Sequence, residues 1–236
     1  MSTKVFLVGA GPGDPEHLTL KALRILQRAH LVLHDDLVSP GILQLVRPGA
    51  QIENVGKRCG QKRITQQEIH SRMVGAARKG VTVVRLQSGD PLVFGRAGEE
   101  MEALRRARIE FEIVPGVTAA IAAAASAKIA LAHTRLASSV IFLTAHTCKK
   151  DEPPSFGTGF APSSTLVIYM PGQDNSRLQE QLLASNITPT TPCVVVSRAS
   201  QPGESHHFTT LDHLIEAPPA ASPAVLLVGA HAASGP

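Results

Sequence analysis

The chain has 236 residues, a length that accommodates two small α/β domains, and its 23 lysines and arginines outnumber its 19 aspartates and glutamates. The net charge of +4 suits an anionic ligand, but it is too small and too dispersed to indicate a nucleic-acid partner. Because aromatic residues make up only 3% of the chain, the core is expected to consist of Val, Leu, Ile and Ala, as in buried parallel strands and packed helices.

The cysteines and the apolar segments favour a cytoplasmic protein without a membrane span. Cys59, Cys148 and Cys193 are far apart and odd in number, which is typical of reduced thiols. The apolar run near the N-terminus continues directly into glycines, unlike a signal peptide. The longest apolar stretch, AAIAAAASAKIALA, is too short to span a bilayer and contains Lys128, so it predicts a buried helix.

Short apolar runs alternate with helical patterns through the first half of the chain. The strand patterns are VFLVG, LVLHD, IENVG, VTVVRL and FEIVPG. The helical patterns between them are LTLKALRILQRA, QQEIHSRMVGAARKG and GEEMEALRRAR. This alternation indicates βαβ units and a largely parallel sheet.

A second set of strand patterns follows the alanine-rich helix. These patterns are SSVIFLTAH, TLVIYMP, PCVVVSR, HHFTTL and PAVLLVG. A Pro- and Gly-rich segment, DEPPSFGTGFAPSS, separates the first two and predicts a surface loop. We therefore predict two α/β domains, residues 1–114 and 115–236, with a ligand cleft between them, because ligands favour domain interfaces.

The glycine-rich loop GAGPGDP follows the first strand pattern and invites comparison with nucleotide-binding loops. A dinucleotide fingerprint requires a glycine where this chain has Asp14, and Pro12 has no N–H to offer a phosphate. Asp14 would also compete with a pyrophosphate for the helix N-terminus. A Walker A loop is excluded because no G-K-[ST] follows. The residues alone leave open a tight turn in which Asp14 caps a helix that begins near Leu18.

A second loop of the same kind follows the fourth strand pattern, in VVRLQSGDPLVFGRAGEE. Its Gly89-Asp90-Pro91 repeats the chemistry of Gly13-Asp14-Pro15. The carboxyl ends of parallel strands lie on one edge of a sheet, where ligands bind. Two glycine-rich loops at that edge favour a cofactor that is read through backbone atoms and is not a polyphosphate.

Several segments together form a specific combination. They are VGAGPGDPEHLTLKAL, VLHDDLVS, VGKRCG…QQEI, VVRLQSGDPLVFGRAGEE and VPGVTAAIAAAA. Through them the chain resembles the tetrapyrrole methylases over essentially its whole length, and within that family the members that methylate uroporphyrinogen III. The resemblance implies that the chain has two α/β domains with S-adenosylmethionine in the cleft between them. It also implies that the protein is a homodimer. S-adenosylmethionine has no phosphate group, so a loop in which Pro12 and Asp14 disfavour phosphate binding can still hold it.

The resemblance also implies functional positions in this chain. The implied cofactor contacts are Pro12, Ser88, Gly89, Asp90, Val93, Thr118, Ala119, Met170 and Ala199. The implied base and acid of the proton transfer are Asp35 and Lys57, and the implied substrate contacts are Arg96 and Glu99. On the residues alone, Asp35 fits a turn cap, Lys57 a solvated lysine, and the other two an i,i+3 ion pair. No spacing of residues indicates a metal site.

Several positions depart from the usual pattern of the family. Gln87 and Ser88 replace a lysine and a glycine, and Ala199 replaces another glycine. Thr134 stands where an arginine is usual, and Arg135 is the substitute that we expect to contact a substrate carboxylate. These departures leave two alternatives open: a methylase of a later corrin precursor, and a cofactor-binding homologue that has lost its activity.

Overall fold

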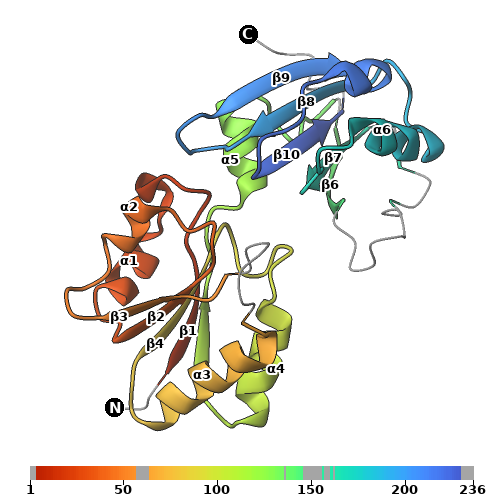
Figure 1. Ribbon diagram of the computed structural model, residues 1–236. Helices are drawn as coiled ribbons and strands as arrows, with labels where there is room; N and C mark the ends of the chain where they lie inside the picture. Colours follow the sequence, from red (N-terminus) through yellow and green to blue (C-terminus); the bar gives the residue numbers. More distant parts are fainter. Residues whose placement is uncertain are drawn as a thin grey trace. The chain divides into compact units, whose positions relative to one another are not determined.

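The computed structural model describes residues 4–56, 64–135, 137–145, 156, 160–161 and 163–229. The chain divides into two compact units, Met1–Thr118 and Ala119–Pro236, and each unit contains a five-stranded sheet (Figure 1). The predicted α/β fold class is confirmed. No helix of the described residues is long and apolar enough to cross a membrane.

The first unit is built on a parallel sheet with the strand order β3-β2-β4-β1-β5. Its strands are β1 (Val5–Gly9), β2 (Leu31–His34), β3 (Gln51–Asn54), β4 (Val83–Gln87) and β5 (Phe111–Val114). All four neighbouring pairs are parallel, as the βαβ pattern predicts. The loops after β1, β2, β4 and β5 therefore leave the sheet at the same edge.

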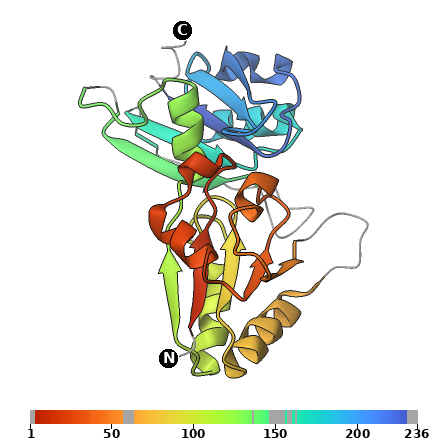
Figure 2. The same ribbon diagram turned by 90° about the vertical axis from the view of Figure 1, so that its left-hand side faces the viewer.

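Helices cover both faces of this sheet (Figures 1 and 2). The helices are α1 (Leu20–Leu26), α2 (Pro40–Leu43), α3 (Gln66–Arg78) and α4 (Ala97–Arg106). One apolar cluster joins α1 and α2 to one face through Leu26 and Ile42. The other joins α3 and α4 to the opposite face through Met73 and Leu104. Strand side chains alternate between these clusters, so both faces are buried, as a parallel sheet requires.

The cap of the first helix differs from the expectation. Asp14 does not cap α1; its Oδ1 accepts from the Glu16 N–H at 2.9 Å and begins a short 3-10 helix, η1 (Pro15–His17). α1 is capped by Thr19, whose Oγ1 accepts from the Ala22 N–H at 3.1 Å. A separate turn therefore stands between the glycine loop and the helix, unlike the direct strand-to-helix turn of a dinucleotide loop.

The second unit contains a mixed sheet with the order β6-β7-β10-β8-β9. Its strands are β6 (Ser139–Thr144), β7 (Ser164–Tyr169), β8 (Pro192–Ser197), β9 (Ser205–Thr210) and β10 (Ala224–Val228), and each of the five predicted strands is present. β6 and β7 are parallel, whereas β10 runs antiparallel to both of its neighbours. β10, the last strand of the described residues, thus lies at the centre of the sheet, a placement that no local pattern could reveal.

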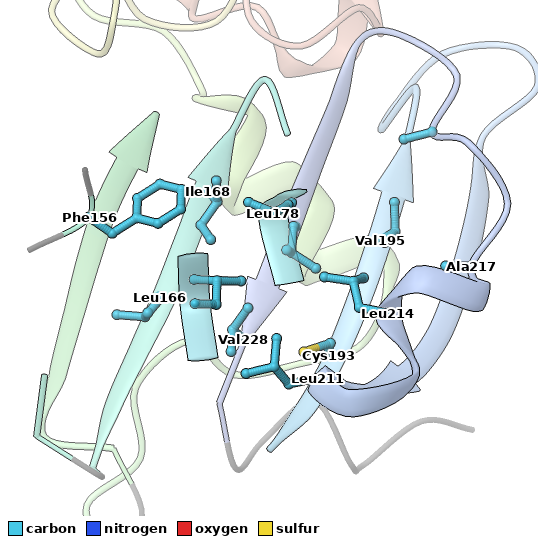
Figure 3. Packing of buried hydrophobic residues seen from close by; sticks show 13 residues of the cluster. Phe156, Leu166, Ile168, Leu178, Cys193, Val195, Leu211, Leu214, Ala217 and Val228 are labelled. Carbon is cyan, nitrogen blue, oxygen red and sulfur yellow. The ribbon is translucent and has the colours of Figure 1, made fainter. Parts of the chain in front are cut away.

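Helices α5 (Ala119–Ser126) and α6 (Asn175–Ala184) and the 3-10 helix η2 (Leu211–Glu216) belong to this unit. The alanine-rich α5 buries four of its eight residues, so the predicted buried helix is present but keeps an exposed face that includes Ile121. α6 was not predicted, although Asp174 caps it and Leu178 and Leu182 mark its buried face. α6 and η2 pack on one face of the sheet through Leu178 and Leu214 (Figure 3).

Cys193 lies fully buried on β8 within this apolar core (Figure 3). Burial raises the pKa of its thiol to about 12, and the charge of Asp212 adds to the effect. Only the thiolate reacts, so in a Cys59→Ser/Cys148→Ser variant we expect Cys193 to react with iodoacetamide at pH 8 roughly a thousandfold more slowly than a free thiol. Labelling followed by mass spectrometry measures this rate. Denaturant should restore ordinary reactivity, whereas rapid labelling of the folded protein would contradict the burial.

Candidate functional site

The two glycine-rich loops of the first unit pair directly with each other. The Gly89 N–H donates to the Gly11 carbonyl at 2.7 Å, and the Gly11 N–H donates to the Gly89 carbonyl at 3.1 Å. Both glycines have a positive φ, 73° for Gly11 and 66° for Gly89, which favours glycine over any other residue. The loops after β1 and β4 therefore form a small antiparallel bridge beyond the edge of the parallel sheet.

A third loop, after β5, packs against the same point. A Cβ placed on Gly9 would lie 2.6 Å from the Gly116 nitrogen and 2.7 Å from the Gly89 oxygen. A Cβ on Gly116 would lie 2.9 Å from the Gly9 Cα. Neither position has room for a side chain, because three backbone segments meet there. Gly9 and Gly116 are therefore required by the packing of the loops on one another.

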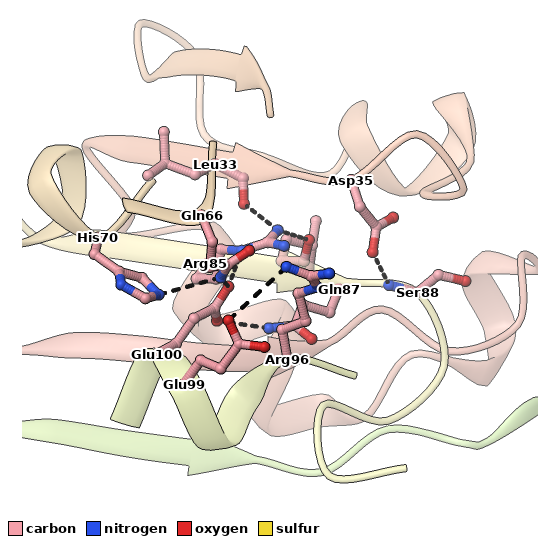
Figure 4. A network of polar contacts seen from close by, with 11 residues as sticks. Leu33, Asp35, Gln66, His70, Arg85, Gln87, Ser88, Arg96, Glu99 and Glu100 are labelled. Carbon is pink, nitrogen blue, oxygen red and sulfur yellow. Dashed lines mark hydrogen bonds and ion pairs between the residues drawn. The ribbon is translucent and has the colours of Figure 1, made fainter. Parts of the chain in front are cut away.

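Asp35, the predicted base, joins two of the segments at this edge. Its Oδ2 accepts from the Ser88 N–H at 3.0 Å (Figure 4), and its Oδ1 accepts from the Leu37 N–H at 3.1 Å. Two backbone hydrogen bonds fix the carboxylate, and each oxygen keeps a lone pair for another partner. The arrangement thus includes the predicted turn cap and leaves the carboxylate able to accept a proton.

Asp90 is bound in the same way. Its Oδ1 accepts from the Leu92 N–H at 2.8 Å and its Oδ2 from the Gly116 N–H at 2.9 Å. Each of these aspartates closes its own turn with one oxygen and binds a neighbouring loop with the other. The loops after β2, β4 and β5 are consequently tied together by charge-assisted hydrogen bonds, which are roughly twice as strong as neutral ones.

The substitutions at Ser88 and Ala199 are compatible with the backbone. The described residues with positive φ include Gly89, Arg198 and Ser200, but neither Ser88 nor Ala199. A side chain is acceptable at both positions because their backbone angles are ordinary for L-residues. These two departures from the family pattern therefore do not distort the loops.

Within the first unit, the structure brings several predicted residues into one group. Asp35, Ser88, Gly89 and Asp90 are linked by the hydrogen bonds above, and the Val93 N–H donates to the Asp90 carbonyl at 3.2 Å. Pro12 is buried between Gly11 and Gly13, and Thr118 ends the unit. Lys57 lies outside the described residues.

The other predicted residues of the cofactor set belong to the second unit. Ala119 is the first residue of α5. Ala199 is buried and lies just after β8, separated from its last residue by Arg198. Met170 follows β7, is exposed and has a φ of 51°. An unbranched residue with a positive φ costs of the order of 1 kcal/mol or more, and such strain gathers at functional sites. Arg135 is exposed, and its N–H donates to the Nδ1 of His133 at 3.2 Å.

Arg96 and Glu99 form a loose pair at the start of α4. The Arg96 Nη1 lies 3.8 Å from the Glu99 Oε2, and the two side chains are 50% and 57% exposed. An exposed pair of this kind contributes little to stability, so both side chains are available to a ligand. The i,i+3 ion pair and a substrate-binding role are therefore compatible.

A buried polar network joins β4 to α4 and was missed by the sequence analysis (Figure 4). Glu100, on α4, is fully buried and pairs with Arg85 of β4, whose Nε lies 2.9 Å from its Oε1. Gln87 donates to the other carboxylate oxygen at 2.7 Å. Arg85, the one charged residue of VVRLQ, a strand expected to be buried, could have signalled an internal partner, because a buried charge is costly when unpaired. Among the described residues, no group of three or more His, Cys, Asp or Glu could hold a metal ion.

The paired glycine loops on a parallel sheet, followed by a mixed-sheet unit, define a two-unit α/β protein with a candidate ligand site at the carboxyl edge of the first sheet. Residues 4–215 match the family described as Tetrapyrrole (Corrin/Porphyrin) Methylases. The chain belongs to this family.

The curated relatives that are 44% identical to the chain include the following two. One is siroheme synthase 1 of Cronobacter sakazakii, matched over 96% of this chain and 48% of the relative. The other is the chloroplastic S-adenosyl-L-methionine-dependent uroporphyrinogen III methyltransferase of Arabidopsis thaliana, matched over 95% of this chain and 62% of the relative. The chain therefore spans about half to three fifths of the length of these relatives.

Solved structures match along nearly the whole chain. Uroporphyrin-III-C-methyltransferase from Thermus thermophilus is 42% identical with a TM-score of 0.82, and the match covers 99% of this chain and 95% of that one. A Thermus thermophilus structure complexed with S-adenyl homocysteine is 36% identical with a TM-score of 0.81, over 96% and 97% of the two chains. Cobalt precorrin-4 methyltransferase is 31% identical with a TM-score of 0.82, over 96% and 94%.

The packing of the three loops predicts the effect of a single methyl group at Gly116. The new Cβ of Gly116→Ala would collide with the Gly89 oxygen and the Gly9 Cα, so we expect the free energy of unfolding to fall by about 2–3 kcal/mol. The matched control is Gly75→Ala inside α3, where the new Cβ would lie within 4 Å of no atom apart from its chain neighbours and the backbone of its own helix. This variant should gain about 0.5–1 kcal/mol, because alanine favours the helix. Denaturant titration measures both changes, and equal stabilities would refute the packing argument.

Proposed function

We propose that this chain transfers methyl groups from S-adenosylmethionine to ring carbons of uroporphyrinogen III, the reaction that produces precorrin-2. The observation that carries the proposal is the likeness along nearly the whole chain to uroporphyrin-III-C-methyltransferase from Thermus thermophilus, at 42% identity. The Arabidopsis thaliana relative, named for the same substrate, adds support at 44% identity.

S-adenosylmethionine is the methyl donor in this proposal. The complex of the Thermus thermophilus protein with S-adenyl homocysteine supports it, and so does the glycine loop, which has an aspartate where a pyrophosphate-binding loop needs a glycine. In the first unit the proposed contacts are Pro12, Ser88, Gly89, Asp90, Val93 and Thr118. The roles of Ala119, Met170 and Ala199 stay predictions from the resemblance. Loops fixed by hydrogen bonds before the cofactor arrives lower the entropic cost of binding.

The transfer itself is an in-line displacement at the methyl carbon of a sulfonium. Its positive charge disperses as the methyl leaves, so alignment in a poorly hydrated site contributes most. The ring system must also lose a proton, which requires a base. We assign this role to Asp35, because its hydrogen bonds to Ser88 and Leu37 hold the carboxylate beside the proposed cofactor loop. Lys57 remains the proposed acid.

The carboxylates of the substrate require cationic partners. Arg96 and Arg135 are exposed and offer planar guanidinium groups that can bind a carboxylate through two hydrogen bonds. Glu99, beside Arg96, completes the proposed substrate contacts. We further propose that the protein acts as a homodimer in the cytoplasm, on the grounds of the family resemblance and of the scattered cysteines.

A methylase of a later corrin precursor is the second candidate, supported by the likeness to cobalt precorrin-4 methyltransferase. Its TM-score equals that of the uroporphyrin-III-C-methyltransferase, so the fold does not discriminate. The identity is 31% against 42%, which favours uroporphyrinogen III as the substrate.

The proposed activity predicts transfer of label from methyl-labelled S-adenosylmethionine to uroporphyrinogen III, detected by chromatography of the tetrapyrroles. Calorimetry should show S-adenosylhomocysteine bound with a Kd on the order of micromolar, about −8 kcal/mol, and no heat with NAD. Label found only in a later corrin precursor would select the second candidate. A protein that binds S-adenosylhomocysteine but methylates neither compound would support the homologue without activity.

The role of Asp35 predicts a selective loss of turnover in Asp35→Asn. An amide cannot accept the proton, so kcat should fall by roughly 100-fold to 10,000-fold while the affinity for S-adenosylhomocysteine stays within about threefold. The control is Asp14→Asn, a second turn-forming aspartate at the same edge, which should keep its turnover. Initial rates and calorimetry on both variants provide the measurement. An unchanged kcat for Asp35→Asn would show that Asp35 only holds the loop in place and does not accept the proton.

A further inference from the structure

Glu100 is a fully buried carboxylate for which the proposed reaction has no use. Its Oε1 accepts from the Nε of Arg85 at 2.9 Å and from the Nε2 of Gln66 at 3.2 Å, and its Oε2 accepts from the Nε2 of Gln87 at 2.7 Å (Figure 4). Arg85 in turn donates through Nη1 to the carbonyl of Leu33 at 3.3 Å. The charge is thus balanced by one cation, and both carboxylate oxygens are satisfied.

Stability alone is a poor explanation for such a network. Removing a carboxylate and an arginine from water is costly, and replacing a buried ion pair by well-packed apolar residues is often neutral or stabilising. The surroundings of Glu100 offer an apolar solution, since Ala97 and Leu104 of the same helix pack into the core. A network that satisfies every member instead fixes one geometry of the segments that it joins.

The segments that meet at Glu100 are those that carry the proposed site. Gln87 is the last residue of β4 and directly precedes Ser88 of the cofactor loop. Glu100 follows Glu99 in the sequence and lies one helical turn beyond Arg96, the two proposed substrate contacts. Gln66 is the first residue of α3. One carboxylate therefore joins the end of the strand that leads into the cofactor loop to the helix that presents the substrate contacts.

Gln87 also contacts the turn between these two segments. A Cβ on Gly95 would lie 2.8 Å from the Gln87 Oε1 and 2.6 Å from the Pro91 carbonyl oxygen. The side-chain amide of Gln87 thus donates to Glu100 from its nitrogen and lies against the turn before Arg96 with its oxygen. Because the amide oxygen packs against Gly95, a shift of Gln87 would be transmitted to the start of α4.

We propose that Glu100 is a positioning residue, with Gln87 as its link, that holds Arg96 and Glu99 at a fixed distance from the Ser88–Asp90 loop. The inference rests on the proposed function, because it concerns the alignment of substrate with the methyl donor. It also accounts for Gln87, where the family pattern has a lysine. Glutamine donates to Glu100 from this position without adding a second buried cation beside Arg85.

The decisive comparison is between Gln87→Met, which removes the donor at similar size, and Gln87→Lys, which keeps a donor. A loosened alignment lowers the rate of transfer more than the binding of either ligand, so Gln87→Met should lose about tenfold to 100-fold in kcat. Its Kd for S-adenosylhomocysteine and its KM for uroporphyrinogen III should change by less than about threefold. Gln87→Lys should retain kcat within about threefold of the wild-type value. Glu102→Gln, which breaks an exposed ion pair with Arg106 on the same helix, is the control for α4.

Kinetics are measured below the unfolding temperature of each variant. Equal kcat values for Gln87→Met and Gln87→Lys would overturn the inference, and so would a parallel loss of kcat and cofactor affinity, which indicates a collapsed loop. Should Gln87→Met fail to fold, Gln66→Met removes a donor at the half-buried end of the network and is judged by the same split between kcat and Kd. A wild-type protein that does not methylate uroporphyrinogen III would overturn the proposed function and the inference together.

Discussion

The backbone of Gly89 is the point on which the candidate site depends. Gly89 exchanges two hydrogen bonds with Gly11, and its carbonyl oxygen lies against Gly9 and Gly116, so the loops after three strands meet there without side chains between them. A Cβ at Gly9 or Gly116 would separate the loops, and a side chain at Gly11 or Gly89 would be strained by the positive φ. At the same edge, the carboxylates of Asp35 and Asp90 accept hydrogen bonds from backbone N–H groups of neighbouring loops.

These contacts make the edge of the first sheet rigid before any ligand binds. Asp35 and Asp90 each use one oxygen within their own turn and the other on a neighbouring loop. A carboxylate that is already held in place loses little conformational entropy when it meets a substrate or a cofactor, so its full interaction energy remains for binding or catalysis. The loops therefore provide both a fixed backbone and a fixed charge for the proposed methyl transfer.

The interiors of the two units differ in their content of polar residues. The second unit buries an almost wholly apolar cluster between its mixed sheet and the helices α6 and η2 (Figure 3). The first unit places an ion pair, Arg85 with Glu100, and the polar partner Gln87 next to an apolar cluster of the same sheet (Figure 4). Because low dielectric strengthens both the attraction of a satisfied pair and the cost of an unsatisfied one, this layer tolerates few alternative arrangements. A layer with few alternative arrangements keeps the strands in place beneath the paired glycine loops.

The sequence by itself determined the strands of both units, the parallel character of the first sheet and the convergence of its loops on one edge, because each follows from local patterns and from the direction of parallel strands. Only the tertiary structure decided three other matters. The central place of β10 depends on pairing with β7 and β8, which lie far away in the sequence. Thr19 rather than Asp14 caps α1, because Pro15 begins a separate turn. Glu99, Glu100 and Glu102 look alike in GEEMEALRR, and only the packing of α4 against β4 turns Glu100 toward Arg85 and leaves the other two in water. A charge becomes buried or exposed through contacts between distant segments, and no local pattern contains those contacts.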